Sequence, residues 1–314
     1  MANARPFRFG VADGDGVPSR EAWATLVRRA EDLGYATFLI ADHYVNAFPP
    51  ISSLMAAADV SSAIRIGSFV FDNDFRHPAQ LAKEVATLDL LSGGRFELGI
   101  GAGWHQPDYE QVGLPFDPAR VRIDRLAEAV TILKQFFTQE TVTFSGAHYT
   151  VTDLQAFPKP LQRPYPPLFI GGGGQRVLTV AGREADIVGF LPRAKDDGSF
   201  DAAERTEAAL AQKVKWVQEA AGERFAAIEL SQLMGTVIVT SDRQQAAEQR
   251  AREGDLPGVT TEHILANPYL LIGTVEQIGE QLHRLRELFG ISYFVVTVDE
   301  MEALAPVVAR LAGA

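Results

Sequence analysis

Two polar residues suited to proton transfer follow an apolar run near the start of the chain. Asp42 and His43 come directly after the run TFLIA at 37–41. A histidine exchanges protons near neutral pH, and a nearby carboxylate can orient a ring or a ligand. A lone histidine is more often structural than catalytic, so its place in the fold decides its role. At the mouth of a barrel, His43 would polarise or protonate a substrate, and Asp42 would orient the substrate or a bound ring.

Four consecutive glycines, residues 171–174, stand between an apolar run and a helical stretch at 175–182. A glycine-rich turn before a helix presents unpaired backbone N–H groups, and the helix dipole adds positive potential there. No Gly-Lys-Ser/Thr follows, so the run is not a Walker loop. A tight turn needs only one or two glycines, so the run predicts a phosphate site. A side chain at Gly173 would then take the place of the anion.

A second glycine-rich stretch, GIGAGW at 99–104, only partly matches a dinucleotide fingerprint. Its sixth position is Trp104, so the pattern G-x-G-x-x-G fails. At the end of a barrel strand, Gly101 and Gly103 would instead leave room for a flat ligand. Trp104 and His105 would lie at its rim, which makes His105 a second candidate for acting on the substrate.

The stretch FDNDFRHP at 71–78 adds further polar residues, among which His77 is expected to cap the following helix. The chain has no cysteine, and it contains neither a G-x-S-x-G elbow nor an H-E-x-x-H motif. Its six histidines lack metal-ligand spacing, so no metal is expected. A mouth rich in glycine and aromatic residues and poor in nucleophiles suits a cofactor that carries the chemistry.

The elements that position these residues alternate between strand and helix. Eight apolar strand-like runs are each followed by a helical element; they begin near residues 7, 37, 64, 95, 168, 185, 229 and 292. This alternation predicts a parallel sheet, and eight units in one chain of this length predict a (β/α)₈ TIM barrel, with a doubly wound sheet as the alternative. In a barrel, the residues that follow the strands share one mouth.

The chain is expected to form a single domain, 1–314, with insertions near 138–165, 192–222 and 254–273. The first insertion reads as a hairpin around Ser145-Gly146, because two alternating runs flank that pair. The other two insertions are candidates for a lid over the mouth.

Charge and hydropathy restrict the classes of partner that the protein could bind. The formal net charge is -11 and no Lys/Arg-rich run occurs, which argues against nucleic acid binding. No apolar stretch is long enough to cross a membrane, and the first residues lack a secretory signal. We therefore expect a cytoplasmic protein that acts on a small molecule.

Four stretches, taken together, resemble the bacterial luciferase-like superfamily. They are RRAEDLGYATFLIADHY at 28–44, IRIGSFVF at 64–71 followed by HPAQLAKEVATLDLLSGGRFELGIGAGW at 77–104, PLFIGGGGQRVLTVAGREADIVGF at 167–190 and GTVEQIGEQLHRLRELFGISYFVV at 273–296. They occur in that order, and the resemblance covers nearly the whole chain. Within it, the chain most resembles the deazaflavin-dependent branch, which uses coenzyme F420. FMN-dependent monooxygenases are more distant.

The resemblance implies a barrel with insertions, usually a homodimer, with the flavin or deazaflavin ring at the strand C-termini. It implies that Gly172, Gly173 and Gly174 form the phosphate-binding turn. It places Phe69-Val70 at the strand-three bulge, where relatives often hold a cis peptide behind the ring.

The resemblance also places Asp42 and His43 near the ring, as in deazaflavin-dependent dehydrogenases. Gly101, Gly103 and Trp104 fall beside the same ring. Sugar-phosphate dehydrogenases of this branch carry Glu where Trp104 stands, so glucose 6-phosphate is a poor substrate candidate.

The resemblance implies an F420-dependent oxidoreductase that transfers a hydride between the cofactor and a small organic substrate. One alternative is an FMN-dependent monooxygenase supplied by a partner reductase. Another is a deazaflavin-binding protein without catalytic activity, although the polar residues at the strand ends weigh against it.

Overall fold

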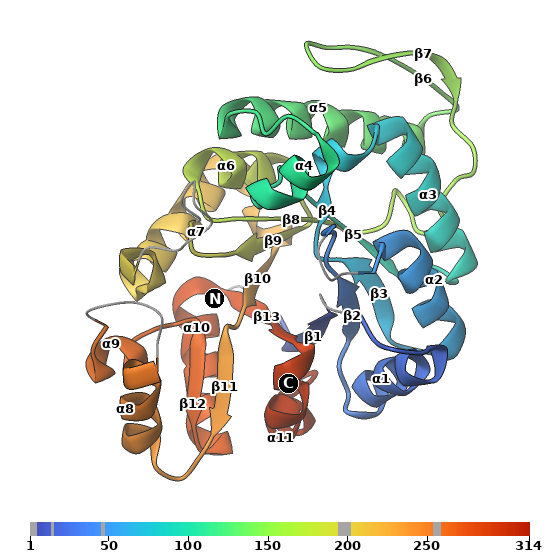
Figure 1. Ribbon diagram of the computed structural model, residues 1–314. Coiled ribbons are helices and arrows are strands. Elements are labelled where there is room, and N and C mark those ends of the chain that lie inside the picture. Colours follow the sequence, from blue (N-terminus) through green and yellow to red (C-terminus); the bar gives the residue numbers. More distant parts are fainter. Residues whose placement is uncertain (1–4, 14–15, 45–47, 194–201, 254–258) are drawn as a thin grey trace.

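A closed barrel of eight parallel strands forms the centre of the protein, as the sequence predicts (Figure 1). The computed structural model describes residues 5–13, 16–44, 48–193, 202–253 and 259–314. The barrel strands are β1 (Arg8–Asp13), β2 (Thr37–Ile40), β3 (Arg65–Ser68), β5 (Phe96–Gly101), β8 (Leu168–Gly172), β9 (Ile187–Phe190), β10 (Glu229–Leu233) and β13 (Ile291–Thr297). They pair in the order β3-β2-β1-β13-β10-β9-β8-β5, and pairing of β3 with β5 closes the ring. The doubly wound alternative is therefore wrong.

Helices surround the barrel and bury their apolar faces against it (Figure 1). They are α1 (Arg20–Asp32), α2 (Pro50–Val60), α3 (Pro78–Leu91), α5 (Ala119–Thr138), α6 (Gln175–Glu184), α7 (Glu207–Ala221), α10 (Val275–Phe289) and α11 (Met301–Leu311). Side chains cap two of these helices at their N-termini: Ser19 caps α1, and Thr274 with Gln277 forms a capping box on α10. Among the described residues, no helix is long and apolar enough to cross a membrane.

One predicted strand is in fact two. The run at 229–240 divides into β10, in the barrel, and β11 (Thr236–Val239), which pairs outside it with β12 (Leu270–Gly273). The backbone N–H of Met234 still bonds to barrel residue Val295, whereas that of Gly235 bonds to Tyr269 before β12. The chain therefore leaves the barrel between these two residues. The helices α8 (Arg243–Glu253) and α9 (Thr261–Leu265) lie between β11 and β12 in sequence.

The predicted hairpin is present. The strands β6 (Thr141–Ser145) and β7 (Thr150–Gln155) pair antiparallel and project from the barrel near α5 (Figure 1). Parts of the two segments expected to form a lid, residues 194–201 and 254–258, lie outside the described residues.

The third strand is interrupted where it reaches the mouth. β3 ends at Ser68, and the two-residue strand β4 (Phe71–Asp72) resumes pairing with β5. The peptide bond between Phe69 and Val70 is cis, as the resemblance implied. The Phe69 ring packs on Phe169 of β8, with ring centroids 5.3 Å apart.

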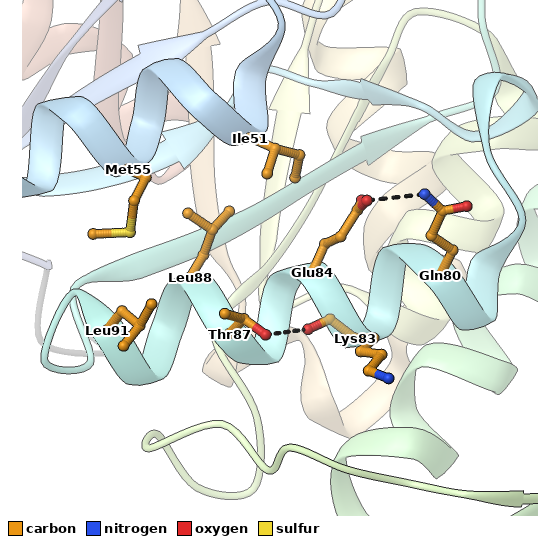
Figure 2. Close-up of a pocket in the computed structure, with 8 residues that line it drawn as sticks. All are labelled: Ile51, Met55, Gln80, Lys83, Glu84, Thr87, Leu88 and Leu91. Atoms are coloured by element: carbon orange, nitrogen blue, oxygen red, sulfur yellow. Dashed lines mark hydrogen bonds between the residues drawn. The ribbon is translucent and has the colours of Figure 1, made fainter.

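A hollow of about 340 Å³ lies between α2 and α3, away from the strand ends (Figure 2). Ile51 and Met55 of α2 face Leu88 and Leu91 of α3 across it. Its polar side chains all come from α3 and bond in part within that helix: Gln80 donates to Glu84, and the Thr87 hydroxyl donates to a backbone carbonyl. The hollow therefore lacks converging polar groups, and the candidate site is at the barrel mouth instead.

Candidate active site

His43, His105 and Asp108 form a hydrogen-bonded cluster at the barrel mouth. His43 follows β2, His105 follows β5, and Asp108 lies on the short helix α4 (Gln106–Val112). The Nδ1 atoms of His43 and His105 lie 2.6 Å and 3.0 Å from the same Asp108 oxygen, Oδ2. The other oxygen, Oδ1, accepts the backbone N–H of Tyr44 at 3.0 Å. The fold thus joins the two predicted histidines through a carboxylate that no sequence motif indicated.

The surroundings of Asp108 favour its ionised form. Its side chain is 2% exposed, and burial alone would raise its pKa. Hydrogen bonds from His43, His105 and the Tyr44 N–H outweigh burial and hold the pKa of Asp108 below its ordinary value. Asp108 is therefore a carboxylate at neutral pH and can accept from all three partners.

Three rings from two strand ends pack together around this carboxylate. The His43 ring meets the rings of Trp104 and His105 edge to face, with centroids 6.0 Å and 5.6 Å apart. Trp104 also packs on His105, at 5.3 Å. The Trp104 side chain is large, apolar and 46% exposed. Because the two histidines are each about 30% exposed, the group offers both an apolar surface and polar ring atoms to a ligand.

The Asp42 carboxylate binds Arg76 and not the ring of His43, the next residue in sequence. Its carboxylate is 7% exposed and forms a bidentate ion pair with Arg76, at 2.5 Å and 3.1 Å. It also accepts the backbone N–H of Asp72 at 3.1 Å. Asp42 therefore holds the loop after β4 against the end of β2, and Asp108 rather than Asp42 holds the His43 ring.

His77, in the same loop, caps α3 as predicted. Its Nδ1 accepts the backbone N–H of Ala79 at 3.2 Å, and Pro78 occupies the first position of the helix. This leaves His77 with a structural role and separates it from the cluster around Asp108.

A buried tyrosine anchors α4 beneath the cluster. The Tyr109 hydroxyl lies 2.8–2.9 Å from the two carboxylate oxygens of Asp72 and donates to that carboxylate. Tyr109 is fully buried, and its ring packs on Phe75 and Phe116. Because Tyr109 is the next residue after Asp108, this anchor fixes the position of the carboxylate that binds both histidines.

Asp72 makes the stability of this region sensitive to pH. Burial raises the pKa of Asp72 to about 7, and the nearby charges of Asp74 and Asp42 add to that rise. The folded-state pKa is above the unfolded value of about 3.9, so the folded protein binds more protons between these two values. Stability is therefore expected to fall as pH rises through this window, by about 2–3 kcal/mol between pH 5 and pH 8.

Asp72→Asn is the matching test, because asparagine imitates the protonated acid. Its oxygen can accept the Asp74 N–H as Asp72 does at 2.9 Å, and its amide can donate to Tyr109. Urea unfolding of wild type and Asp72→Asn at pH 5 and pH 8 isolates the contribution of Asp72 to the free energy of unfolding. We expect the wild type to lose about 2–3 kcal/mol more than the variant on going to pH 8. Parallel pH profiles would show that Asp72 does not titrate there.

The glycine run ends β8 and leads directly into α6. None of its four residues has a positive φ, so the turn does not need glycine for that reason. An added Cβ at Gly172 would lie 2.4 Å from the Val177 side chain. At Gly173 it would lie 2.6–2.7 Å from backbone atoms of Arg193 and Leu191. The space expected for an anion at the Gly173 Cβ is thus filled by the chain after β9, and the two glycines permit close packing.

Gly174 differs from its neighbours because the space beside it is open. An added Cβ there meets only the Arg193 side chain, at 4.0 Å. Gly174 is the N-cap of α6 and offers no side-chain cap. The first backbone N–H groups of a helix have no partner within it, so this open end of α6 suits an anion. Arg176, in the same turn, is paired with Asp124 of α5.

Gly101 and Gly103 also pack against protein rather than leave space for a ligand. A Cβ at Gly101 would lie 2.8 Å from Val70, and one at Gly103 would lie 1.9 Å from the Tyr109 hydroxyl. Gly103 also has φ +73°, which favours glycine. The expectation that these glycines make room for a flat ligand is therefore corrected: they let β5 approach the bulge after β3 and the anchor of α4.

The cluster also has the composition of a metal site, although none was expected from the scattered histidines. Ligand atoms of His43, His105 and Asp108 lie within 4.8 Å of one another. The separations of 2.6 Å and 3.0 Å from Nδ1 to Oδ2 are within hydrogen-bond reach, so a shared proton acceptor accounts for the convergence.

The fold is a TIM barrel, and the candidate site residues follow its strands. The chain belongs to the luciferase-like monooxygenase family, because the model of that family matches residues 4–263. The F420-dependent tetrahydromethanopterin reductase of Methanopyrus kandleri has a similar structure, with a TM-score of 0.79 and 19% identity. That likeness covers 98% of this chain and 99% of the reductase. At this identity it establishes the fold alone.

Two curated relatives are similar over part of their length. An F420-dependent glucose-6-phosphate dehydrogenase of Intrasporangium calvum is 34% identical over 173 residues, which is 52% of this chain and 51% of the relative. An FMNH(2)-dependent dimethylsulfone monooxygenase of Pseudomonas putida is 36% identical over 109 residues, 35% of this chain and 30% of the relative. This chain thus spans about half the length of the first relative and less than a third of the second.

Proposed function

We propose that this protein is a coenzyme F420-dependent oxidoreductase acting on a small organic substrate. The observation that carries the proposal is the pair of features at the mouth: an open helix end suited to a phosphate, and a histidine cluster suited to a polar substrate group. The partial similarity to an F420-dependent dehydrogenase supports the choice of cofactor. When bound, the deazaflavin supplies the hydride-transfer chemistry.

The chain would hold the cofactor at two places. The N-terminus of α6, with Gly172, Gly173 and Gly174 before it, would take the phosphate on backbone N–H groups. Arg193 lies beside Gly174 and would add positive charge. Arg193 also pairs with Glu204, its Nε lying 3.6 Å from Oε1, so an anion at the α6 N-terminus would compete with that carboxylate for the guanidinium.

The ring would lie against the strand-three bulge and the end of β5. Phe69 and Val70 are partly buried hydrophobic residues at the bulge. Gly101 and Gly103 keep the β5 backbone close behind them, and Trp104 provides an exposed aromatic surface. This apolar wall would orient the ring and exclude water from the reacting face.

His43 would act on the substrate by polarising or protonating its oxygen, and His105 is the second candidate for that role. A positioned general acid or base contributes typically 10²–10⁴-fold to a rate. Asp42 contributes indirectly, because it holds Arg76 and the loop behind His43. We do not extend glucose 6-phosphate to this chain, because Trp104 stands where the resemblance implies Glu in sugar-phosphate dehydrogenases.

The FMN-dependent monooxygenase is the second candidate, and similarity to an FMNH(2)-dependent monooxygenase favours it. The anion site at α6 would suit the FMN phosphate equally, so the phosphate turn alone does not separate the two cofactors. A partner reductase would then supply the reduced flavin.

Three further expectations remain proposals. We infer a single domain over 1–314, a homodimer as the resemblance implies, and a cytoplasmic location. Sedimentation equilibrium tests the second against the chain mass of 34.2 kDa, with twice that mass expected.

A turnover screen tests the proposed activity. Purified protein is mixed with oxidised F420 and a panel of small alcohols, and with reduced F420 and small carbonyl compounds, while the visible absorbance of the deazaflavin is followed. We expect at least one substrate to change that absorbance catalytically. Turnover only with reduced FMN and oxygen would instead support the monooxygenase.

A further inference from the structure

We infer that Asp108 is a positioning residue that fixes both His43 and His105 with the proton on Nδ1, so that the Nε2 atom of each ring is the one available to a ligand. The chemical part of this inference rests on contacts within the chain. Its kinetic consequence rests on the proposed function, and the two are tested separately below.

The proton pattern follows from the donors around the carboxylate. The backbone N–H of Tyr44 can only donate, so Oδ1 of Asp108 must accept it. An ionised carboxylate has only acceptors, so Oδ2 must accept from both histidine Nδ1 atoms as well. A neutral histidine that carries its proton on Nδ1 has a free lone pair on Nε2. Both rings are therefore set as proton acceptors at Nε2 when neutral, and as donors there when charged.

The geometry disfavours the opposite pattern, in which both rings carry the proton on Nε2. Asp108 is almost fully buried, so water cannot replace a lost partner at its oxygens. The backbone N–H of Asp108 donates to the His105 carbonyl at 3.1 Å, which ties the carboxylate to the residue it orients. Tyr109 holds the same turn of α4 through Asp72. One side chain, on one anchored turn, thus sets the rings that follow two different strands.

The arrangement is specific to a carboxylate at position 108. In Asp108→Asn, the amide oxygen would still accept the Tyr44 N–H, and the amide NH₂ would then face the two Nδ1 atoms. Each Nδ1 would have to accept, and the proton would move to Nε2. The substitution keeps the shape of the side chain and reverses the proton pattern of both rings.

Long-range ¹H–¹⁵N spectra of histidine-labelled protein test the inference without any substrate or cofactor. The His43 and His105 signals are assigned with His43→Gln and His105→Gln. At about pH 8, where unperturbed histidine is neutral, we expect both rings of the wild type as the Nδ1–H tautomer. We expect both as the Nε2–H tautomer in Asp108→Asn. Asp59→Asn, the same exchange at an exposed site on α2, should leave both signals unchanged.

The inference would be overturned by Nε2–H rings in the wild type, or by Asp108→Asn rings that keep the proton on Nδ1. If Asp108→Asn does not fold, by circular dichroism, the wild-type tautomers alone decide. Histidine signals of a metal complex that EDTA removes would also overturn it, as would tight binding of equimolar Zn²⁺ in place of the protons.

The kinetic consequence is a loss of turnover in folded Asp108→Asn of about 10²-fold or more, with cofactor affinity unchanged. Correct tautomers in a protein that turns over no F420 substrate would leave the role of Asp108 intact and reject the proposed function. Full turnover in a variant whose tautomers have reversed would contradict the positioning role.

Discussion

His43→Ala is expected to lower turnover by about 10²–10⁴-fold while leaving the cofactor Kd within about twofold. The imidazole is the polar group at the end of β2, partly exposed at the mouth, and it is held by a buried carboxylate at 2.6 Å. Its loss removes a proton donor or acceptor from the substrate but none of the groups proposed to bind the phosphate. Steady-state rates and a fluorescence titration of the cofactor measure the two quantities on the same preparations.

His77→Ala is the matched control for this prediction. His77 also follows a strand at the mouth, but its Nδ1 caps α3. Its removal should cost about 1 kcal/mol of unfolding free energy through the lost cap and leave turnover nearly unchanged. Wild-type turnover in His43→Ala would return His43 to a structural role, and an equal loss in both variants would show that the effect is not specific.

Gly174→Val is expected to weaken cofactor binding by about tenfold or more in a folded protein. An anion at a helix N-terminus gains up to about 2 kcal/mol in favourable geometry, and a side chain at this position would cover the open end of α6. Gly173→Val should weaken binding too, but through displacement of the backbone at Leu191 and Arg193. Gly174→Val is thus the cleaner test, because the space beside it is open. Calorimetric titration gives the affinities.

Two arginines near this turn provide a matched pair. Arg193→Ala should weaken binding, because Arg193 lies beside Gly174. Arg176→Ala should have a smaller effect, because Arg176 forms a close ion pair with Asp124, whereas Arg193 contacts Glu204 only at 3.6 Å. If folded Gly174→Val binds the cofactor as tightly as the wild type, the glycines serve only to pack the turn, and the phosphate lies elsewhere at the mouth.

The barrel was predictable because its signal is repeated along the whole chain. Each barrel strand belongs to an apolar run, and some helices carry clear start residues, such as Ser19 and Thr274. The break between β10 and β11 was not predictable in the same way, because only Met234 and Gly235 separate the two strands in the run ELSQLMGTVIVT at 229–240. There the partner strand, β12, decides the structure, and its pairing is non-local.

The site was predictable at the level of residues but not of contacts. His43 and His105 were found because they follow strands, and the fold brings them together as neighbours. Asp108 was missed because it is 65 positions from His43 and belongs to a short helix with no motif of its own. The available signal was a carboxylate in the first turn of the helix after β5. It becomes meaningful only when the barrel places β2 and β5 on either side of β3.

For the glycines, the residues were identified but their role was not. Their positions were found correctly, but a run of glycines does not reveal whether ligand or protein fills the space. At Gly101 and Gly103 it is Val70 and Tyr109 that fill it, and within the run 171–174 only Gly174 borders open space.

A side-by-side titration of the purified protein with F420 and FMN shows which of the two cofactors the barrel mouth prefers. Both ligands carry a phosphate and a flat ring, so a difference in affinity reports how the bulge after β3 and the end of β5 receive the ring and its attached chain. We expect F420 to bind more tightly than FMN. Micromolar binding of FMN with no detectable binding of F420 would contradict the account.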